Sequence, residues 1–182
     1  SDQHPWFIES RASRDNPKRD WYIWRDPAPD GGPPNNWESL FGGSAWTLDE
    51  ATGQYYLHLF LEEQPDLNWR NPEVVGAMHD ILHYWLDMGV DGFRIDVVTF
   101  IMKHPDFPDN PPATPADRAL DPVSNFQHKY DISHPDVHRE LKVMRRIFDS
   151  YDRDRVMIGE TIDMDPHKLA QYYGDKLDEL HI

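Results

Sequence analysis

The chain has 182 residues, of which 38% are hydrophobic and 13% aromatic, and its formal net charge is -15. This length is enough for one sizeable core, and the acidity argues against nucleic acid or an anionic membrane as a partner, because those are bound by clustered Lys and Arg. No cysteine is present, which excludes disulfides and Cys-based sites and leads us to expect a cytoplasmic location. We find neither a signal peptide nor an apolar run long enough to span a membrane.

The first stretch, residues 1–67, is aromatic-rich, irregular and punctuated by prolines. Asp20–Arg25 and Tyr55–Phe60 predict short strands, so we expect a small domain of loops and a little sheet. Three aromatic residues beside the Gly42-Gly43 pair are predicted to pack in a loop core rather than to form a sugar-stacking surface: Trp37, Phe41 and Trp46.

The pattern becomes helical at Asn71, where Pro72 suits the first turn and Gly89 marks the end. Apolar residues recur at alternating steps of four and three, which predicts a buried stripe. The stripe consists of Val74, Met78, Ile81, Trp85 and Met88.

A short β-branched run, Gly89–Phe100, predicts a buried strand that carries two charges, Arg94 and Asp96. Residues two apart in a strand point to the same face, and buried charge is normally paired or functional because isolated burial is costly. We therefore hypothesise that Asp96 is a catalytic carboxylate.

The segment from Lys103 to about His134 is crowded with prolines and predicts a long structureless loop, which we interpret as a lid over an active site. Its aspartates between Asp106 and Asp121 lack the spacing of a calcium loop, so we read them as solvated charge and expect no metal. The prolines are Pro105, Pro108, Pro111, Pro112, Pro115 and Pro122.

A second amphipathic helix is predicted from near Pro135, followed by a buried strand, Val156–Glu160, and a short helical stretch at Pro166–Tyr173. Parallel strands linked by helices have all their carboxyl ends on one side, so Asp96 and Glu160 should converge. The predicted apolar face of the helix is Val137, Leu141, Met144, Phe148 and Tyr151.

Two carboxylates at one rim suit glycoside hydrolysis, in which one acid stays ionised and the other holds a proton for the leaving oxygen. Arg94 beside Asp96 favours the ionised form of that carboxylate, whereas Glu160 has no adjacent cation in the sequence and can hold a proton more easily. The alternative is a structural Arg94–Asp96 ion pair with Glu160 as a helix-capping acid.

These residues resemble motifs of the α-amylase family of glycoside hydrolases. Gly92–Val98 is similar to the family segment that bears the nucleophile, and Gly159–Thr161 to the one that bears the acid/base. Gln64–Trp69 resembles the marker of the α-glucosidase and oligo-1,6-glucosidase group. Four further segments resemble that group's small inserted domain: His4–Phe7, Tyr22–Trp24, Phe41–Trp46 and His58–Phe60.

The resemblance implies a role for each matching residue. Asp96 would be the nucleophile, Glu160 the general acid/base, and Arg94 a clamp on the nucleophile and substrate. Phe60 would help to wall the sugar pocket. Val97 would influence linkage, because in that family a valine after the nucleophile accompanies α-1,6 activity.

The implied fold is α/β: part of a (β/α)8 TIM barrel, around strands four and five, with a small inserted domain after strand three. Residues 1–67 would form the inserted domain and residues 68–182 the central part of the barrel. The family also has an Asp and a His on an earlier strand and a His-Asp pair on a later one, and neither stretch is present. We therefore expect an internal fragment that is inactive alone, because a barrel cannot close with so few strands.

The implied activity is that of a retaining, exo-acting α-glucosidase that hydrolyses short α-glucosides such as isomaltose through a covalent glycosyl-Asp intermediate, without a cofactor. Three alternatives remain open: a transglucosidase or a sucrose- or trehalose-type glucoside isomerase of the same family, a non-catalytic transporter-associated homologue, and a binding-only carbohydrate module. Oligomeric state leaves no signal in the sequence.

Overall fold

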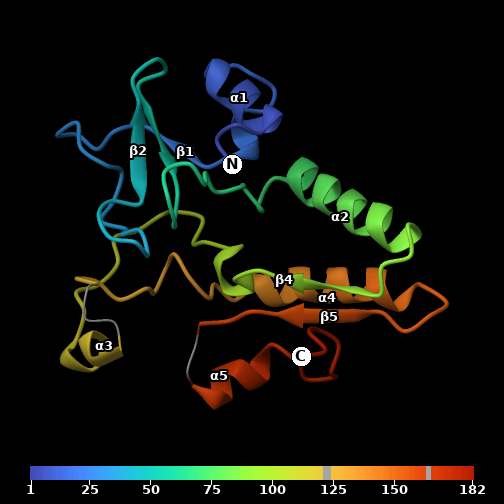
Figure 1. Cartoon of the computed structure of the whole chain (residues 1–182). Coiled ribbons are helices and arrows are strands. Elements are labelled where there is room, and N and C mark those ends of the chain that lie inside the picture. The colour runs from blue at the N-terminus through green and yellow to red at the C-terminus, as the bar shows by residue number, and fades with distance from the viewer. Residues whose placement is uncertain (121–123, 163–164) are drawn as a thin grey trace. The chain divides into compact units, whose positions relative to one another are not determined.

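The computed structural model describes residues 1–120, 124–162 and 165–182. It contains two compact units. The first comprises Ser1–Val74 and His104–Asp131, and the second Val75–Lys103 and Ile132–Ile182. The elements, in chain order (Figure 1), are α1 (Pro5–Ala12), η1 (Arg19–Trp21), β1 (Trp24–Arg25), β2 (Trp46–Asp49), β3 (Gln54–Leu57), α2 (Pro72–Asp87), β4 (Gly92–Ile95), η2 (Val98–Phe100), α3 (Pro115–Leu120), α4 (Asp136–Asp149), β5 (Val156–Gly159) and α5 (Pro166–Gln171).

The first unit contains a three-stranded antiparallel sheet in the order β1-β3-β2. Its strands are shorter than predicted: within Asp20–Arg25 the first residues form the 3-10 turn η1, and β3 ends before His58. Strand β2 and helix α1 were not predicted at all. The helix begins at Pro5 and is capped by His4, whose side chain accepts a hydrogen bond from the Trp6 N–H. Histidine is not a usual capping residue, so the sequence does not mark the start of this helix.

An aromatic cluster forms the core of this unit around Phe7, which is fully buried. The Phe7 ring lies parallel to that of Trp24, with centroids 5.7 Å apart, and meets Tyr22 and Tyr56 edge-on. The buried Arg19 guanidinium lies 3.5 Å from the Trp24 ring centroid. Offset and edge-on contacts of this kind add to the free energy gained from burial alone.

The aromatic residues near the Gly42-Gly43 pair differ in how far they are buried. Trp37 and Trp46 are buried, which confirms the core packing predicted for them, whereas Phe41 is 66% exposed, so that prediction was wrong for Phe41. Both glycines have positive φ, and this turn carries the Phe41 side chain away from the core.

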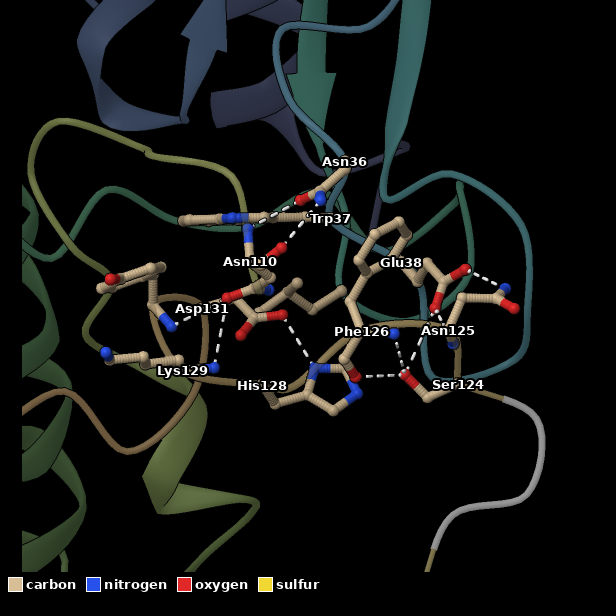
Figure 2. A network of polar contacts seen from close by, with 12 residues as sticks. Asn36, Trp37, Glu38, Asn110, Ser124, Asn125, Phe126, His128, Lys129 and Asp131 are labelled. Atoms are coloured by element: carbon tan, nitrogen blue, oxygen red, sulfur yellow. Dashed lines mark hydrogen bonds and ion pairs between the residues drawn. The ribbon is translucent and has the colours of Figure 1, made fainter. Parts of the chain in front are cut away.

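The proline-rich segment is not structureless, which corrects the prediction. It contains helix α3 and a bridge between Pro112 and Phe126, although Pro122 and Asp121 lie outside the described residues. Asn36 and Asn110 join it to the rest of the unit: Asn110 N–H donates to Asn36 Oδ1 at 2.7 Å, and Asn36 Nδ2 donates to the Asn110 carbonyl at 2.9 Å (Figure 2). Side-chain amides thus replace the backbone ladder that the prolines cannot form.

Glu38 makes a second attachment in the same unit. Its carboxylate accepts hydrogen bonds from the Ser124 hydroxyl and from both the main chain and the side chain of Asn125, at 2.7 to 3.2 Å (Figure 2). Asp131, fully buried, lies 2.8 Å from His128 Nδ1. These contacts fix the end of the segment, while its predicted role as a lid stays a prediction.

Helix α2 has nearly the predicted bounds, but the predicted buried stripe was partly wrong. Ile81, Trp85 and Met88 are 38%, 46% and 67% exposed, whereas Leu82 and Leu86 are buried. The helix carries apolar side chains on two adjoining faces, and spacing alone does not say which face is covered. Of the helices in the described ranges, none is long and apolar enough to cross a membrane.

Helix α4 confirms most of its prediction, since Val137, Leu141, Met144 and Phe148 are all buried. The prediction was wrong for Tyr151, which follows the end of the helix at Asp149 and is only partly buried. Phe148 meets Phe93 of β4 edge-on, with ring centroids 5.9 Å apart. The opposing helix α2 supplies His79, whose Nε2 lies 2.5 Å from the buried carboxylate of Glu140 on α4. The second unit is therefore a two-stranded sheet, β4-β5, with α4 packed on it (Figure 1).

Gly92, the first residue of β4, stands too close to β5 for a side chain. A Cβ atom there would lie 2.1 Å from the Val156 carbonyl oxygen, a separation that real Cβ contacts do not reach. Close approach of two backbones is a common reason for glycine inside a strand.

We expect Gly92→Ala to lower the free energy of unfolding by about 1 to 3 kcal/mol, because the strands must separate to admit the methyl group. The matched control is Gly76→Ala on α2, where a Cβ would meet nothing within 4 Å and where alanine should raise stability by roughly 0.5 to 1 kcal/mol. Urea unfolding of the full-length protein measures both. Equal effects of the two changes would contradict this account of Gly92.

Candidate active site

The site is set up by the pairing of β4 with β5. The strands are parallel and pair Gly92 with Val156 and Ile95 with Gly159, so the predicted parallel arrangement is confirmed. Asp96 and Glu160 are each the first residue after their strand. Because parallel neighbours end on the same side, both carboxylates lie at one edge.

The backbone fixes Glu160 from both directions. Its N–H donates to the Ile95 carbonyl, and its own carbonyl accepts from the Val98 N–H, each at 3.0 Å. The ladder thus continues one step beyond the strands. Buried residues then anchor the chain that follows, since Val98, Thr99 and Phe100 of η2 are all covered.

Arg94 bridges the two carboxylates. One guanidinium nitrogen contacts Asp96 Oδ1, and the other lies 2.6 Å from Glu160 Oε2. The sequence suggested that Glu160 lacks a neighbouring cation; the structure overturns that, because strand pairing brings Arg94 across. The two acids are therefore not distinguished by which of them has a cation beside it.

The three charged side chains are not buried, contrary to the expectation for this strand. Arg94, Asp96 and Glu160 side chains are 52%, 73% and 40% exposed. Nor does Asp96 lie within the strand, which ends at Ile95. Charges that remain hydrated carry little desolvation cost, so these groups are accessible to a polar ligand.

Val97 adopts a left-handed backbone conformation, with φ 37° and ψ 53°. For a β-branched residue this costs roughly 1 to 2 kcal/mol, and such strain persists only where surrounding contacts hold it. Its N–H donates to Glu160 Oε2 at 3.2 Å. This contact could not be predicted from the sequence, because valine is among the least expected residues in that conformation.

Phe60 belongs to the first unit, and its predicted contact with sugar stays a prediction. Within its own unit it is half-buried and meets Phe41 edge-on, with ring centroids 6.0 Å apart. Its carbonyl accepts from the Ser39 hydroxyl at 2.7 Å and from His58 Nδ1 at 3.0 Å. The main chain at Phe60 is thereby fixed.

Within residues 1–120, 124–162 and 165–182, no group of three or more His, Asp or Glu side chains could hold a metal ion. What the edge between β4 and β5 offers is two accessible carboxylates and one shared cation. Such a set can supply a nucleophile or base together with a proton donor.

Comparison with known proteins gives one consistent relationship. The family model for the α-amylase catalytic domain matches residues 1–182. An oligo-1,6-glucosidase of Parageobacillus thermoglucosidasius is 47% identical over 183 residues, covering 100% of this chain and 31% of that protein. The chain thus spans about a third of the length of such curated relatives.

Solved structures agree. An α-glucosyl transfer enzyme, XgtA, superposes with a TM-score of 0.92 at 44% identity, covering 100% of this chain and 35% of that one. The trehalulose synthase MutB gives a TM-score of 0.81 at 43% identity, covering 100% and 31%. The family resemblance read from the motifs is confirmed: the chain belongs to the α-amylase catalytic-domain family.

Proposed function

We propose that this chain is the central part of a retaining α-glucosidase that acts on short α-glucosides. The observation that carries the proposal is the parallel β4-β5 edge, where Asp96 and Glu160 follow neighbouring strands and share Arg94. The accessible carboxylates and the names of the relatives support the same reaction class. No cofactor is needed for it.

The proposed reaction has two steps, formation and hydrolysis of a covalent bond between Asp96 and the sugar. A carboxylate oxygen of Asp96 forms a bond to the anomeric carbon while the bond from that carbon to the glycosidic oxygen breaks, and the proton of Glu160 moves to that oxygen. Water then attacks the same carbon, returns a proton to Glu160 and releases Asp96. Configuration is retained because two inversions occur.

The assignment of Asp96 as nucleophile and Glu160 as acid/base rests on the matching family motifs, because Arg94 contacts both carboxylates. In this proposal Arg94 donates to the Asp96 carboxylate and stabilises the negative charge that Glu160 acquires when its proton leaves. Phe60 walls the sugar pocket, and Val97 favours α-1,6 linkages as in isomaltose.

The architecture proposed for the whole protein is a (β/α)8 barrel, in which β4 and β5 are strands four and five. Residues 1–67 form an inserted domain after strand three, and residues 68–182 belong to the barrel. A cytoplasmic location is part of the proposal. Two features of the second unit support a larger structure: a sheet of only two strands and the exposed apolar face of α2.

A second candidate function is transfer or isomerisation of a glucosyl group. The same covalent intermediate serves if a sugar hydroxyl replaces water as acceptor. The likeness to an α-glucosyl transfer enzyme and to a trehalulose synthase favours this candidate. Product analysis of the full-length protein with maltose, isomaltose, sucrose and trehalose separates the two. Arg94, Asp96 and Glu160 together argue against a non-catalytic homologue.

In the full-length protein, Asp96→Asn should lower kcat about a thousandfold or more because it removes the nucleophile. Glu160→Gln should lower the rate on isomaltose by about 10² to 10⁴, and with an activated aryl α-glucoside it should let a glycosyl adduct on Asp96 accumulate, visible by mass spectrometry. Asp91→Asn, at the opposite end of β4 with a side chain 87% exposed, is the matched control. Full activity of Asp96→Asn would remove that residue from the mechanism.

Substituting Val97 tests the linkage preference. Val97→Thr should move the ratio of kcat/KM for isomaltose over maltose toward maltose by a factor of about 10 to 100, the range that a methyl-sized change produces. Steady-state kinetics on both disaccharides measure the ratio. An unchanged ratio would show that linkage is read elsewhere.

The chain of residues 1–182 expressed alone should show no hydrolysis of an aryl α-glucoside. Backbone hydrogen bonds from His181 and to Ile182 cover the outer edge of β5, but among the described residues β4 pairs with β5 alone. An unpaired strand edge and exposed apolar surface destabilise a cut barrel. The full-length protein is the positive control, and turnover by the isolated chain would contradict the expectation.

A further inference from the structure

The carboxyl group of Glu160 is held by one oxygen. Oε2 lies 2.6 Å from Arg94 Nη2 and accepts the Val97 N–H at 3.2 Å. Among the described residues, none donates to Oε1. The two oxygens of this carboxyl group are therefore inequivalent, a difference that cannot be predicted from the sequence motif.

The left-handed turn at Val97 explains why a main-chain N–H reaches Glu160. Two consecutive N–H groups converge on this one residue: that of Val97 on the side-chain oxygen and that of Val98 on the main-chain carbonyl at 3.0 Å. The positive φ of Val97 turns the chain between β4 and η2. A valine would not adopt that conformation without contacts to hold it.

We infer that Val97 is a positioning residue for Glu160 through its main-chain N–H, an inference that rests on the proposed glycosidase function. With Oε2 occupied by two donors, the transferable proton resides on Oε1. In the first step the O–H bond at Oε1 breaks as the proton bonds to the glycosidic oxygen, and the electron pair stays on the carboxylate. The Val97 N–H and Arg94 then stabilise the negative charge on Oε2.

This role is separate from any contact that the Val97 side chain makes with substrate. A side-chain role changes which linkage binds, whereas the N–H affects only the step that needs a proton. Substrates with poor leaving groups require that proton, and substrates with very good leaving groups do not. The two roles can therefore be distinguished by the leaving group.

The test replaces Val97, in the full-length protein, by its α-hydroxy acid analogue, which keeps the side chain but exchanges the N–H for an ester oxygen. The matched control is the same replacement at Val98, which is also a valine that donates to Glu160 but to the carbonyl instead of the carboxylate. For each variant, kcat/KM is measured with isomaltose and with 2,4-dinitrophenyl α-glucoside. This constant reports the first chemical step.

The Val97 ester should lower kcat/KM for isomaltose about tenfold or more beyond any change for the dinitrophenyl substrate. The Val98 ester should affect both substrates alike. An equal effect of the Val97 ester on the two substrates, or no effect, overturns the inference. Glu160→Gln separates the two possible failures. If this variant keeps full activity on isomaltose, the proposed function itself fails. If it loses activity while the Val97 ester affects both substrates equally, only the positioning role of Val97 is rejected.

Val97→Gly provides a second measurement if the ester protein does not fold. Glycine keeps the N–H and accepts positive φ without a Cβ penalty. Because the lost side chain should also change linkage preference, this variant is compared on two aryl α-glucosides, phenyl and 2,4-dinitrophenyl, and the ratio of their kcat/KM values should stay within about twofold of the native ratio, whatever happens to the overall rate. A tenfold change in that ratio would contradict the inference.

Discussion

The parallel pairing of β4 with β5 is the constraint on which the candidate site depends. It joins two segments that are far apart in the chain. A carboxylate residue directly follows each strand, so the pairing brings the two carboxylates to one edge. The ladder extends to Glu160, whose N–H and carbonyl both bond across the pair. Because the register of the two strands is fixed, Arg94 can contact Glu160 and Asp96 at the same time. A shift of one residue would move Glu160 away from Arg94, whereas Arg94 and Asp96 would stay neighbours on one segment.

The first unit shows how side chains fix a proline-rich segment that has little regular structure. Prolines remove N–H donors, so side chains supply the pairing: Asn36 and Asn110 bond reciprocally, and Glu38 accepts three donors from two neighbouring residues. Asn110 also accepts the N–H groups of Lys129 and Tyr130 at 3.1 and 3.0 Å. Buried polar groups are rarely left unpaired, and here asparagine meets that requirement.

How much the sequence predicts depends on the physical signal. Helices α2 and α4 and strands β4 and β5 were predicted because a repeat of apolar residues and a glycine stop are local features. Asp96 and Glu160 were identified from their motifs. The covered face of α2, the exposure of Phe41 and the fold of the proline-rich segment were not predicted, because they depend on contacts between residues distant in the chain.

The same limit applies to the site. Arg94 beside Asp96 is visible in the sequence, but its contact with Glu160 exists only once two strands pair in one register. The left-handed backbone conformation of Val97 is even harder to predict, because it opposes the conformational preference of valine and is held by tertiary contacts. Sequence motifs therefore indicated the residues of the candidate site, and strand pairing determined which of them contact one another.

The partial exposure of Arg94, Asp96 and Glu160 has a consequence for how firmly the bridge holds. Charges in contact with water attract one another weakly, and ion pairs of this kind contribute about 0 to 1 kcal/mol. Dissolved ions reduce the attraction further, over a screening length of about 8 Å at physiological ionic strength. A bound sugar that displaced water from this edge would lower the local dielectric and strengthen the same contacts. In the proposed glycosidase, the contacts of Arg94 with the two acids would therefore be stronger with a sugar bound than without one.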